Sequence, residues 1–167
     1  NYDGNRLFKI ASGASDYDYN WTEVLMKNVG HRMDGLSLHY YTVLGWSGSK
    51  GSATKFNDED YYWTMGKCRE IEDVLKRHIA IMDKYDPQKQ IGLMVDEWGT
   101  WWDEEPGTIS GHLYQQNTLR DAFVASLSLD IFHKYTDRVK MTNIAQLVNV
   151  LQSMILTKED KMVLTPT

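Results

Sequence analysis

The sequence has few features of a disulfide-stabilised, membrane-embedded or nucleic-acid-binding protein. A single cysteine, Cys68, occurs in 167 residues, so we expect a buried helical thiol and no internal disulfide. No apolar run approaches the ~18 residues of a membrane span, which predicts no membrane partner. Lys and Arg number 18 against 23 Asp and Glu, giving a net charge of −5. Without a basic cluster to offset that charge, we expect no nucleic-acid partner.

Metal-ligand spacing and targeting signals are also missing. The five histidines, at positions 31, 39, 78, 112 and 133, form no HxxxH or Cys/His pair, so we expect no transition-metal site, while binding of another ion by acidic oxygens stays open. The segment Asn1–Arg6 has neither the basic nor the apolar region of a signal peptide, which predicts a cytoplasmic location. The chain lacks an initiator Met and stops just after a proline, so we expect both ends to be cut from something longer.

Residue patterns along the chain predict alternating strands and helices. Apolar runs bounded by turn residues indicate buried strands, and apolar side chains at helical spacing indicate helices. The helix over about 58–85 is expected to bury a stripe that includes His78 as a core residue. The predicted order is strand 8–12, helix 20–30, strand 36–41, helix 58–85, strand 91–98, helix 113–134, strand 139–145 and helix 147–156, followed by an extended segment at 162–165.

This alternation predicts an α/β fold with a parallel sheet. Four strand–helix units fit either part of a doubly wound sheet or half of a (β/α)₈ TIM barrel. No GxGxxG or P-loop follows a strand, so nucleotide binding has no support. The barrel predicts polar residues at successive strand ends, and such residues occur at Ser12, at 39–41, at Asp96 and Glu97, and at 143–146. The pattern therefore favours the barrel.

The stretch at 91–102 has the strongest chemical signal. An apolar run ends in two carboxylates and three tryptophans: Asp96, Glu97, Trp98, Trp101 and Trp102. Retaining glycosidases need two carboxyl groups about 5–5.5 Å apart, and Glu97 is the candidate for one of them. In a regular strand Asp96 points to the opposite face, so we expect it to order the loop through backbone amides. The alternative is that Asp96 caps the next segment and the tryptophans are core.

Four segments, in order along the chain, carry a resemblance to a known family. Leu36–Tyr41, Val95–Gly99, Leu113–Asp121 and Met141–Val150 resemble the family 51 glycoside hydrolases, the α-L-arabinofuranosidases. The resemblance implies a (β/α)₈ barrel with a β-sandwich and retaining cleavage of terminal α-L-arabinofuranosyl groups. It also implies an arabinose-containing oligo- or polysaccharide partner, no cofactor and a homo-oligomer when intact. By this resemblance residues 1–167 are the C-terminal half of the barrel, strands five to eight with their helices.

The resemblance also implies roles for individual residues. Glu97 corresponds to the nucleophile, and Tyr41 corresponds to the tyrosine that contacts it. Trp101 corresponds to a tryptophan that lines the sugar pocket, and Gln146 to a glutamine that binds the sugar. His39 shares a strand face with Tyr41, so it is a further candidate for lining the site. Tyr40 and Trp98 are expected to pack in the core instead.

One part of the family pattern is absent. The acid/base glutamate of the family follows an asparagine at the end of the fourth strand, and no Asn-Glu pair occurs in this sequence. We therefore expect the isolated chain to be inactive. Two alternatives stay open: a non-catalytic sugar-binding or structural fragment, and another retaining glycosidase of the same barrel type, such as a xylanase or cellulase.

Overall fold

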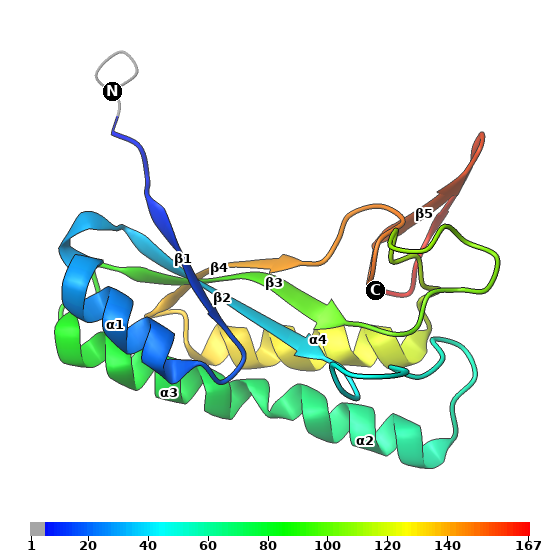
Figure 1. Ribbon diagram of the computed structural model, residues 1–167, viewed down its shortest axis with the longest axis horizontal. Helices are drawn as coiled ribbons and strands as arrows, with labels where there is room; N and C mark the ends of the chain where they lie inside the picture. Colours follow the sequence, from blue (N-terminus) through cyan, green and yellow to red (C-terminus); the bar gives the residue numbers. More distant parts are fainter. Residues whose placement is uncertain (1–5) are drawn as a thin grey trace.

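The chain forms a four-stranded parallel sheet. A computed structural model describes residues 6–167, and residues 1–5, which hold most of the segment examined for a signal peptide, lie outside that range. The strands pair in the order β1-β2-β3-β4, as Figure 1 shows. Their bounds are Ile10–Ser15, Gly35–Thr42, Gly92–Thr100 and Val139–Ile144. The predicted α/β class with a parallel sheet is confirmed.

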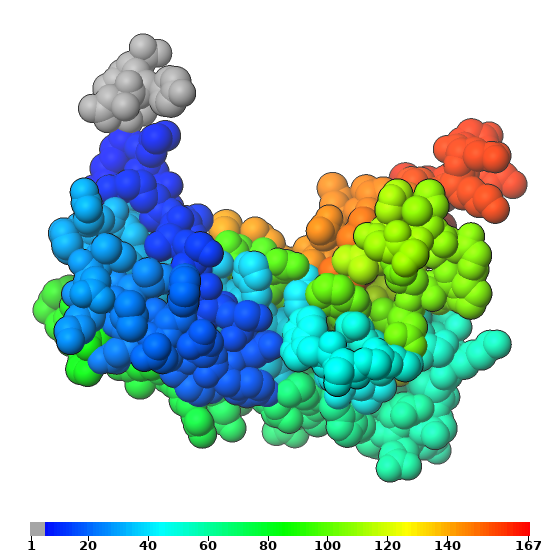
Figure 2. Space-filling model, viewed as in Figure 1, coloured from blue at the N-terminus to red at the C-terminus, as the bar shows by residue number. Residues whose placement is uncertain are grey.

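The helices all lie on one face of this sheet (Figure 1). They are α1 (Tyr19–Val29), α2 (Asp58–Arg69), α3 (Ile71–Tyr85) and α4 (Leu119–Lys134), with a short 3₁₀ turn, η1, at Gly30–Arg32. A doubly wound sheet has helices on both faces, whereas the other face here carries none within residues 6–167. Figure 2 shows that this side is hollowed between the segment ahead of β1 and the C-terminal hairpin. No helix in this range is long and apolar enough to span a membrane.

The C-terminal segment differs most from the prediction. The helix expected at 147–156 is wrong, because that stretch is irregular and leads into an antiparallel hairpin of β5 (Ile155–Lys158) and β6 (Lys161–Leu164). Asn149 and Leu151 have φ angles of 58° and 51°, in the left-handed region that a helix cannot contain. The side chain of Gln152 is buried and bonds to backbone groups of neighbouring elements. The extended segment predicted at 162–165 is largely confirmed as β6.

Two other helices also deviate from their patterns. The helix predicted at 58–85 is two helices, α2 and α3, separated at Glu70. The helical spacing of Leu119, Phe123, Leu127 and Ile131 predicts that α4 buries these four residues, but Leu119 and Phe123 are 68% and 50% exposed and only Ile131 is buried. The helix instead buries smaller side chains such as Val124 and Ala125 against the core.

The main core lies between the sheet and the helices. Leu36, Leu38 and Tyr40 of β2 point into it together with Leu93 and Val95 of β3. These are alternate residues of each strand, as expected for one face of a sheet. Ser37, His39 and Tyr41, the residues between and after them on β2, therefore face the open side.

Two residues singled out in the sequence are structural. His78 is fully buried, with Nδ1 2.8 Å from Thr22 Oγ1 and Nε2 2.9 Å from the Asp16 carbonyl. Burial lowers its pKa, and contacts with Asp16 and Asp18 only partly offset that effect. Cys68 is a buried free thiol beside Ser128, and burial raises its pKa. Both predictions of core residues are confirmed.

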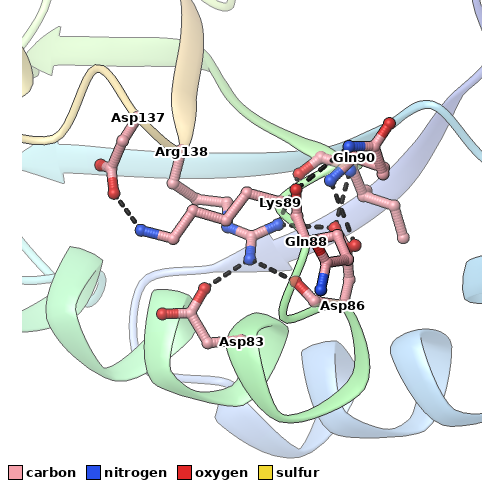
Figure 3. A network of polar contacts seen from close by, with 8 residues as sticks. Asp83, Asp86, Gln88, Lys89, Gln90, Asp137 and Arg138 are labelled. Atoms are coloured by element: carbon pink, nitrogen blue, oxygen red, sulfur yellow. Dashed lines mark hydrogen bonds and ion pairs between the residues drawn. The ribbon is translucent and has the colours of Figure 1, made fainter.

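A buried arginine fixes the end of the sheet where β3 and β4 begin. Arg138 is fully buried, and its Nη1 donates to Asp86 Oδ2 at 2.7 Å and to the Ile91 carbonyl at 2.9 Å. Its Nη2 donates to the Asp86 carbonyl at 2.8 Å and to the Asp83 carboxylate. Figure 3 shows the guanidinium directed at the end of α3. Burial would raise the pKa of Asp86, but hydrogen bonds from the Ile91 amide and Arg138 outweigh it and lower that pKa.

Candidate active site

A bulge in β3 determines which side chains reach the open face of the sheet. Ser37 pairs with Met94 but His39 pairs with Glu97, so β3 has one more residue than β2 over this interval. The pairing with β4 shows the same excess, since Val95 pairs with Thr142 and Trp98 with Ile144. An extra residue in one strand interrupts the alternation of its side chains. Val95 and Trp98 both face the helices, and the two acids between them both face the open side.

A regular strand would point the two carboxylates in opposite directions. That prediction is wrong, because the bulge turns both of them to the open side. His39 contacts both of them: its Nε2 lies 3.3 Å from Asp96 Oδ1, and its Nδ1 lies 3.1 Å from Glu97 Oε2. A neutral imidazole donates through one nitrogen only, so both contacts are hydrogen bonds only when the ring is protonated. The prediction that His39 and Tyr41 share a face is confirmed by their common contact with Glu97.

Asp96 has a different partner from the one expected. Ser37 Oγ donates to Asp96 Oδ1 at 2.5 Å, from the open face of β2. The predicted bonds from backbone amides to the Asp96 carboxylate are not found within residues 6–167. Because its contacts are with Ser37 and His39, Asp96 orients the histidine beside Glu97 and does not order the following loop.

Tyr41 holds the other oxygen of Glu97. The Tyr41 hydroxyl donates to Glu97 Oε1, opposite the oxygen that His39 contacts. Burial raises the pKa of the Tyr41 phenol, and the adjacent Glu97 carboxylate raises it further. Tyr41 therefore stays protonated and acts as a hydrogen-bond donor. With one contact on each oxygen, the Glu97 carboxylate is fixed in orientation.

Three aromatic rings lie beside this carboxylate. The centroids of Tyr41 and Trp101 are 5.0 Å apart, and Trp46 lies 5.5 Å from Trp101 and 6.2 Å from Tyr41, all edge to face. Edge-to-face packing is a favoured arrangement of aromatic rings. Trp46 comes from the long loop after β2, and the sequence alone gave it no role. Trp98, by contrast, packs on Phe132 in the core, as predicted.

A buried polar network supports the loop that carries Trp101. Asp121 Oδ1 accepts from Thr100 Oγ1 at 2.6 Å and from Trp102 Nε1 at 2.8 Å, so the residues on either side of Trp101 are tied to α4. Gln115 Oε1 accepts from the Trp102 amide, and Gln152 Oε1 accepts from the Thr100 amide, both at 2.9 Å. No role for this network could be predicted from local patterns, since its members come from four separate segments.

Gln146 lies just beyond β4, after a residue that packs with Tyr41. The amide of Ala145 donates to the Trp98 carbonyl at 2.9 Å, and Ala145 shares a small cluster with Tyr41. Gln146 itself is exposed and lines a hollow of about 560 Å³ together with His112 and Tyr114. Its role in sugar binding stays a prediction.

The site contains no evident metal-binding group. No set of three or more His, Cys, Asp or Glu side chains within the described part of the chain is arranged to hold a metal ion. What the geometry offers is a fixed carboxylate, a tyrosine donor, a histidine between two acids, and aromatic faces. Such a set suits nucleophilic attack by a carboxylate on a neutral, ring-shaped substrate.

Comparisons with known proteins point to one family. Residues 96–167 match the family described as alpha-L-arabinofuranosidase C-terminal domain. The chain is 84% identical to an intracellular exo-alpha-L-arabinofuranosidase of Bacteroides ovatus, over 100% of this chain and 32% of that protein. It is 27% identical to an intracellular exo-alpha-(1→5)-L-arabinofuranosidase of Acetivibrio thermocellus, over 87% of this chain and 30% of that protein.

A solved structure shows the same fold. The crystal structure of the GH51 arabinofuranosidase from Xanthomonas axonopodis pv. citri superposes with a TM-score of 0.95 at 53% identity, covering 98% of this chain and 33% of that one. The chain thus spans about a third of the length of these relatives. The resemblance found in the sequence is confirmed: this chain corresponds, in sequence and in fold, to about one third of a family 51 α-L-arabinofuranosidase.

Proposed function

We propose that this chain supplies the nucleophile of a retaining α-L-arabinofuranosidase, and that the nucleophile is Glu97. The observation that carries the proposal is the clamp on the Glu97 carboxylate, with Tyr41 on Oε1 and His39 on Oε2. The clamp lies near the C-terminal end of a central parallel strand, where barrel enzymes place their chemistry. A fixed carboxylate beside aromatic faces is suited to attack on the anomeric carbon of a bound furanose.

We also propose that residues 1–167 form half of a (β/α)₈ barrel, strands five to eight. Three observations support this arrangement: four parallel strands in sequential order, helices on a single face, and a hollowed opposite side. A closed barrel has its helices outside and its eight strands around a packed interior. The remaining strands, and the acid/base glutamate, would come from the rest of the enzyme. Within residues 6–167, β4 is followed by the β5–β6 hairpin and not by the helix predicted at 147–156.

In the proposed mechanism, Glu97 attacks the anomeric carbon while the acid/base glutamate protonates the leaving oxygen. Water then releases arabinose from the glycosyl-enzyme intermediate, with the same glutamate acting as base. Tyr41 holds the attacking carboxylate in place throughout. Trp101 and Trp46 provide apolar faces for the furanose, and Gln146 offers both a donor and an acceptor for its hydroxyls.

Asp96 is not the second catalytic carboxyl group, for a reason that differs from the one suggested by strand alternation. The imidazole of His39 lies between Asp96 and Glu97, within 3.3 Å of one and 3.1 Å of the other. The glycosidic bond would have to occupy that space if these acids flanked it. We therefore assign Asp96 the role of holding His39.

The substrate class and location follow from the relatives. Two of them are named exo-arabinofuranosidases, one with α-(1→5) specificity, and both are named intracellular. We infer that the complete protein removes terminal arabinofuranosyl groups from arabinose-containing oligosaccharides inside the cell. No cofactor takes part in this chemistry.

The test is replacement of Glu97 in the complete enzyme. Glu97→Ala should lower the turnover of an aryl α-L-arabinofuranoside by several orders of magnitude, because the covalent step loses its nucleophile. Glu104→Gln, in the loop beyond the site, is the matched control and should retain activity. Near-normal turnover by Glu97→Ala would overturn the assignment. Preference for aryl xylopyranosides or glucopyranosides would identify the xylanase- or cellulase-like alternative instead.

A further inference from the structure

A second hollow lies near the C-terminal ends of β1 and β2, and Tyr41 and Trp46 are among its lining residues. Its volume is about 420 Å³. It is bounded by the loop after β1, the loop after β2, α2 at Trp63 and Lys67, and Glu70, which follows that helix. The residues that matter for its chemistry are Asp16, Tyr17, Trp46, Trp63, Lys67 and Glu70. Apart from Tyr41 and Trp46, its lining residues take no part in the proposed hydrolysis.

One wall is a polar network with fixed geometry. Lys67 Nζ donates to Tyr17 Oη at 2.7 Å and to Glu70 Oε2 at 2.8 Å, and the Tyr17 hydroxyl donates to the same carboxylate oxygen at 2.6 Å. Burial would raise the pKa of Glu70, but the bonds from Lys67 and Tyr17 outweigh it and lower that pKa. Glu70 is therefore ionised, and its Oε1 has no hydrogen-bond partner within residues 6–167. That oxygen is available to accept a hydrogen bond from a ligand hydroxyl.

Asp16, which also lines the hollow, provides a second acceptor. It follows β1 directly, and its amide donates to the His39 carbonyl at 2.9 Å, which places it beside the strand of Tyr41. Burial raises the pKa of its carboxyl. The charge of Lys67, the Tyr41 backbone and the Trp46 side chain lower that pKa, but they offset the effect of burial only in part. Asp16 thus faces the hollow from a partly dry position, where hydrogen bonds are stronger than in water.

Two tryptophans give the hollow its apolar surface. Trp46 is 54% exposed and Trp63 is 38% exposed, although large aromatic side chains are usually well buried. Flat apolar faces combined with carboxylate acceptors suit a ring that has both C–H faces and hydroxyl donors. The carboxylates of Asp16, Asp18 and Glu70 outnumber the single ammonium of Lys67, so an anionic ligand is disfavoured.

We propose that this hollow is an accessory subsite for a neutral sugar ring of the substrate, beyond the furanose that is cleaved. The inference rests on the proposed function, which makes the complete enzyme bind a chain of linked sugars. Tyr41 and Trp46 connect the hollow with the catalytic site. Tyr41 lines the hollow and also donates to Glu97, and Trp46 lines the hollow and packs on Trp101. A chain of sugars held at Trp63 would thus be anchored beside the nucleophile.

The experiment uses Trp63, which lies outside the catalytic clamp. In the complete enzyme carrying Glu97→Gln, so that the ligand is not cleaved, binding of α-(1→5)-linked arabinotriose is measured by calorimetry. Trp63→Ala and Trp63→Leu should each raise the Kd about tenfold, because truncating an aromatic anchor removes most of its contact surface. Trp63→Leu keeps an apolar side chain and serves if the smaller residue disturbs folding. Tyr62 lies on the same helix, is 72% exposed and does not line the hollow. Tyr62→Ala is therefore the control and should bind the triose as tightly as the parent.

Kinetics then separate this subsite from the catalytic site. With Glu97 intact, Trp63→Leu should leave kcat/KM for an aryl arabinofuranoside unchanged and raise KM for the triose. Unaltered triose binding in both Trp63 variants, or no triose binding by the parent, would overturn the subsite. Failure of the parent to hydrolyse the aryl arabinofuranoside would refute the proposed function instead. In that case a weaker Kd in the Trp63 variants would still support the subsite.

Discussion

The clamp on Glu97 makes a quantitative prediction for Tyr41→Phe. The substitution removes one hydroxyl and keeps the ring that packs on Trp101, so it isolates the bond from Tyr41 to Glu97 Oε1. His39 still contacts Oε2, and the carboxylate loses only one of its two constraints.

The size of the effect follows from the charge on the acceptor. A hydrogen bond to a charged group contributes about 1.5–3 kcal/mol. At about 1.4 kcal/mol per factor of ten, its loss should lower kcat/KM roughly 10- to 150-fold if the bond is fully used in the transition state. The expected loss is much smaller than that of Glu97→Ala, because the nucleophile itself is still present.

The assay is hydrolysis of an aryl α-L-arabinofuranoside by the complete enzyme, with Tyr40→Phe as the matched control. Tyr40 is the neighbouring residue on β2 but faces the helices, where its hydroxyl donates to the Lys67 carbonyl at 2.6 Å. Tyr40→Phe should therefore cost about 1 kcal/mol of stability and leave kcat/KM unchanged.

Two results would refute this reasoning. If Tyr41→Phe retains kcat/KM within twofold of the parent, the hydroxyl does not position the nucleophile. If Tyr40→Phe loses as much activity as Tyr41→Phe, the loss reflects a general disturbance of β2. Circular dichroism of each variant separates either result from misfolding.

Two further predictions concern stability. Arg138→Met should lower the free energy of unfolding by about 3–5 kcal/mol in denaturant titrations, because it leaves Asp86 buried without its partner. Asp83→Asn, which removes the more exposed partner, should cost about 1 kcal/mol or less. Equal effects would show that burial of Asp86 is not decisive. Because burial lowers the pKa of His78, the folded protein binds fewer protons than the unfolded chain below the ordinary histidine pKa of about 6.5, so stability should fall as pH drops below that value. His78→Gln should flatten this dependence of the melting temperature on pH, and an unchanged slope would assign it to other groups.

Much of the sheet was predictable because buried strands leave a direct trace in the sequence. Leu36 and Leu38, which alternate with a serine, and the apolar run Leu93–Val95 are bounded by glycine or polar residues, and both lie in central strands. Tyr40 and Trp98 were expected to pack, and both do, because each lies on the helix-facing side of its strand.

The failures came from features that local patterns do not record. A helix at 147–156 fits the apolar spacing, but left-handed backbone angles at Asn149 and Leu151 exclude it. The position of Trp46 beside Trp101 depends on how a long loop returns to the sheet. The bulge has a faint trace, since two acids separate Val95 from Trp98 where alternation allows only one outward residue. That trace is visible only when the neighbouring strands are aligned.

The bulge has a consequence for which changes β3 can accept. Its position makes the site depend on the number of residues between Val95 and Trp98, and not only on their identity. Deleting Asp96 or Glu97 would restore regular pairing and leave a single acid facing the open side. The site would then lose either the nucleophile or the acid that holds His39, whichever residue was kept. Inserting a residue would turn Trp98 out of the core and away from Phe132. We therefore expect this stretch to accept conservative substitutions more readily than any change in length.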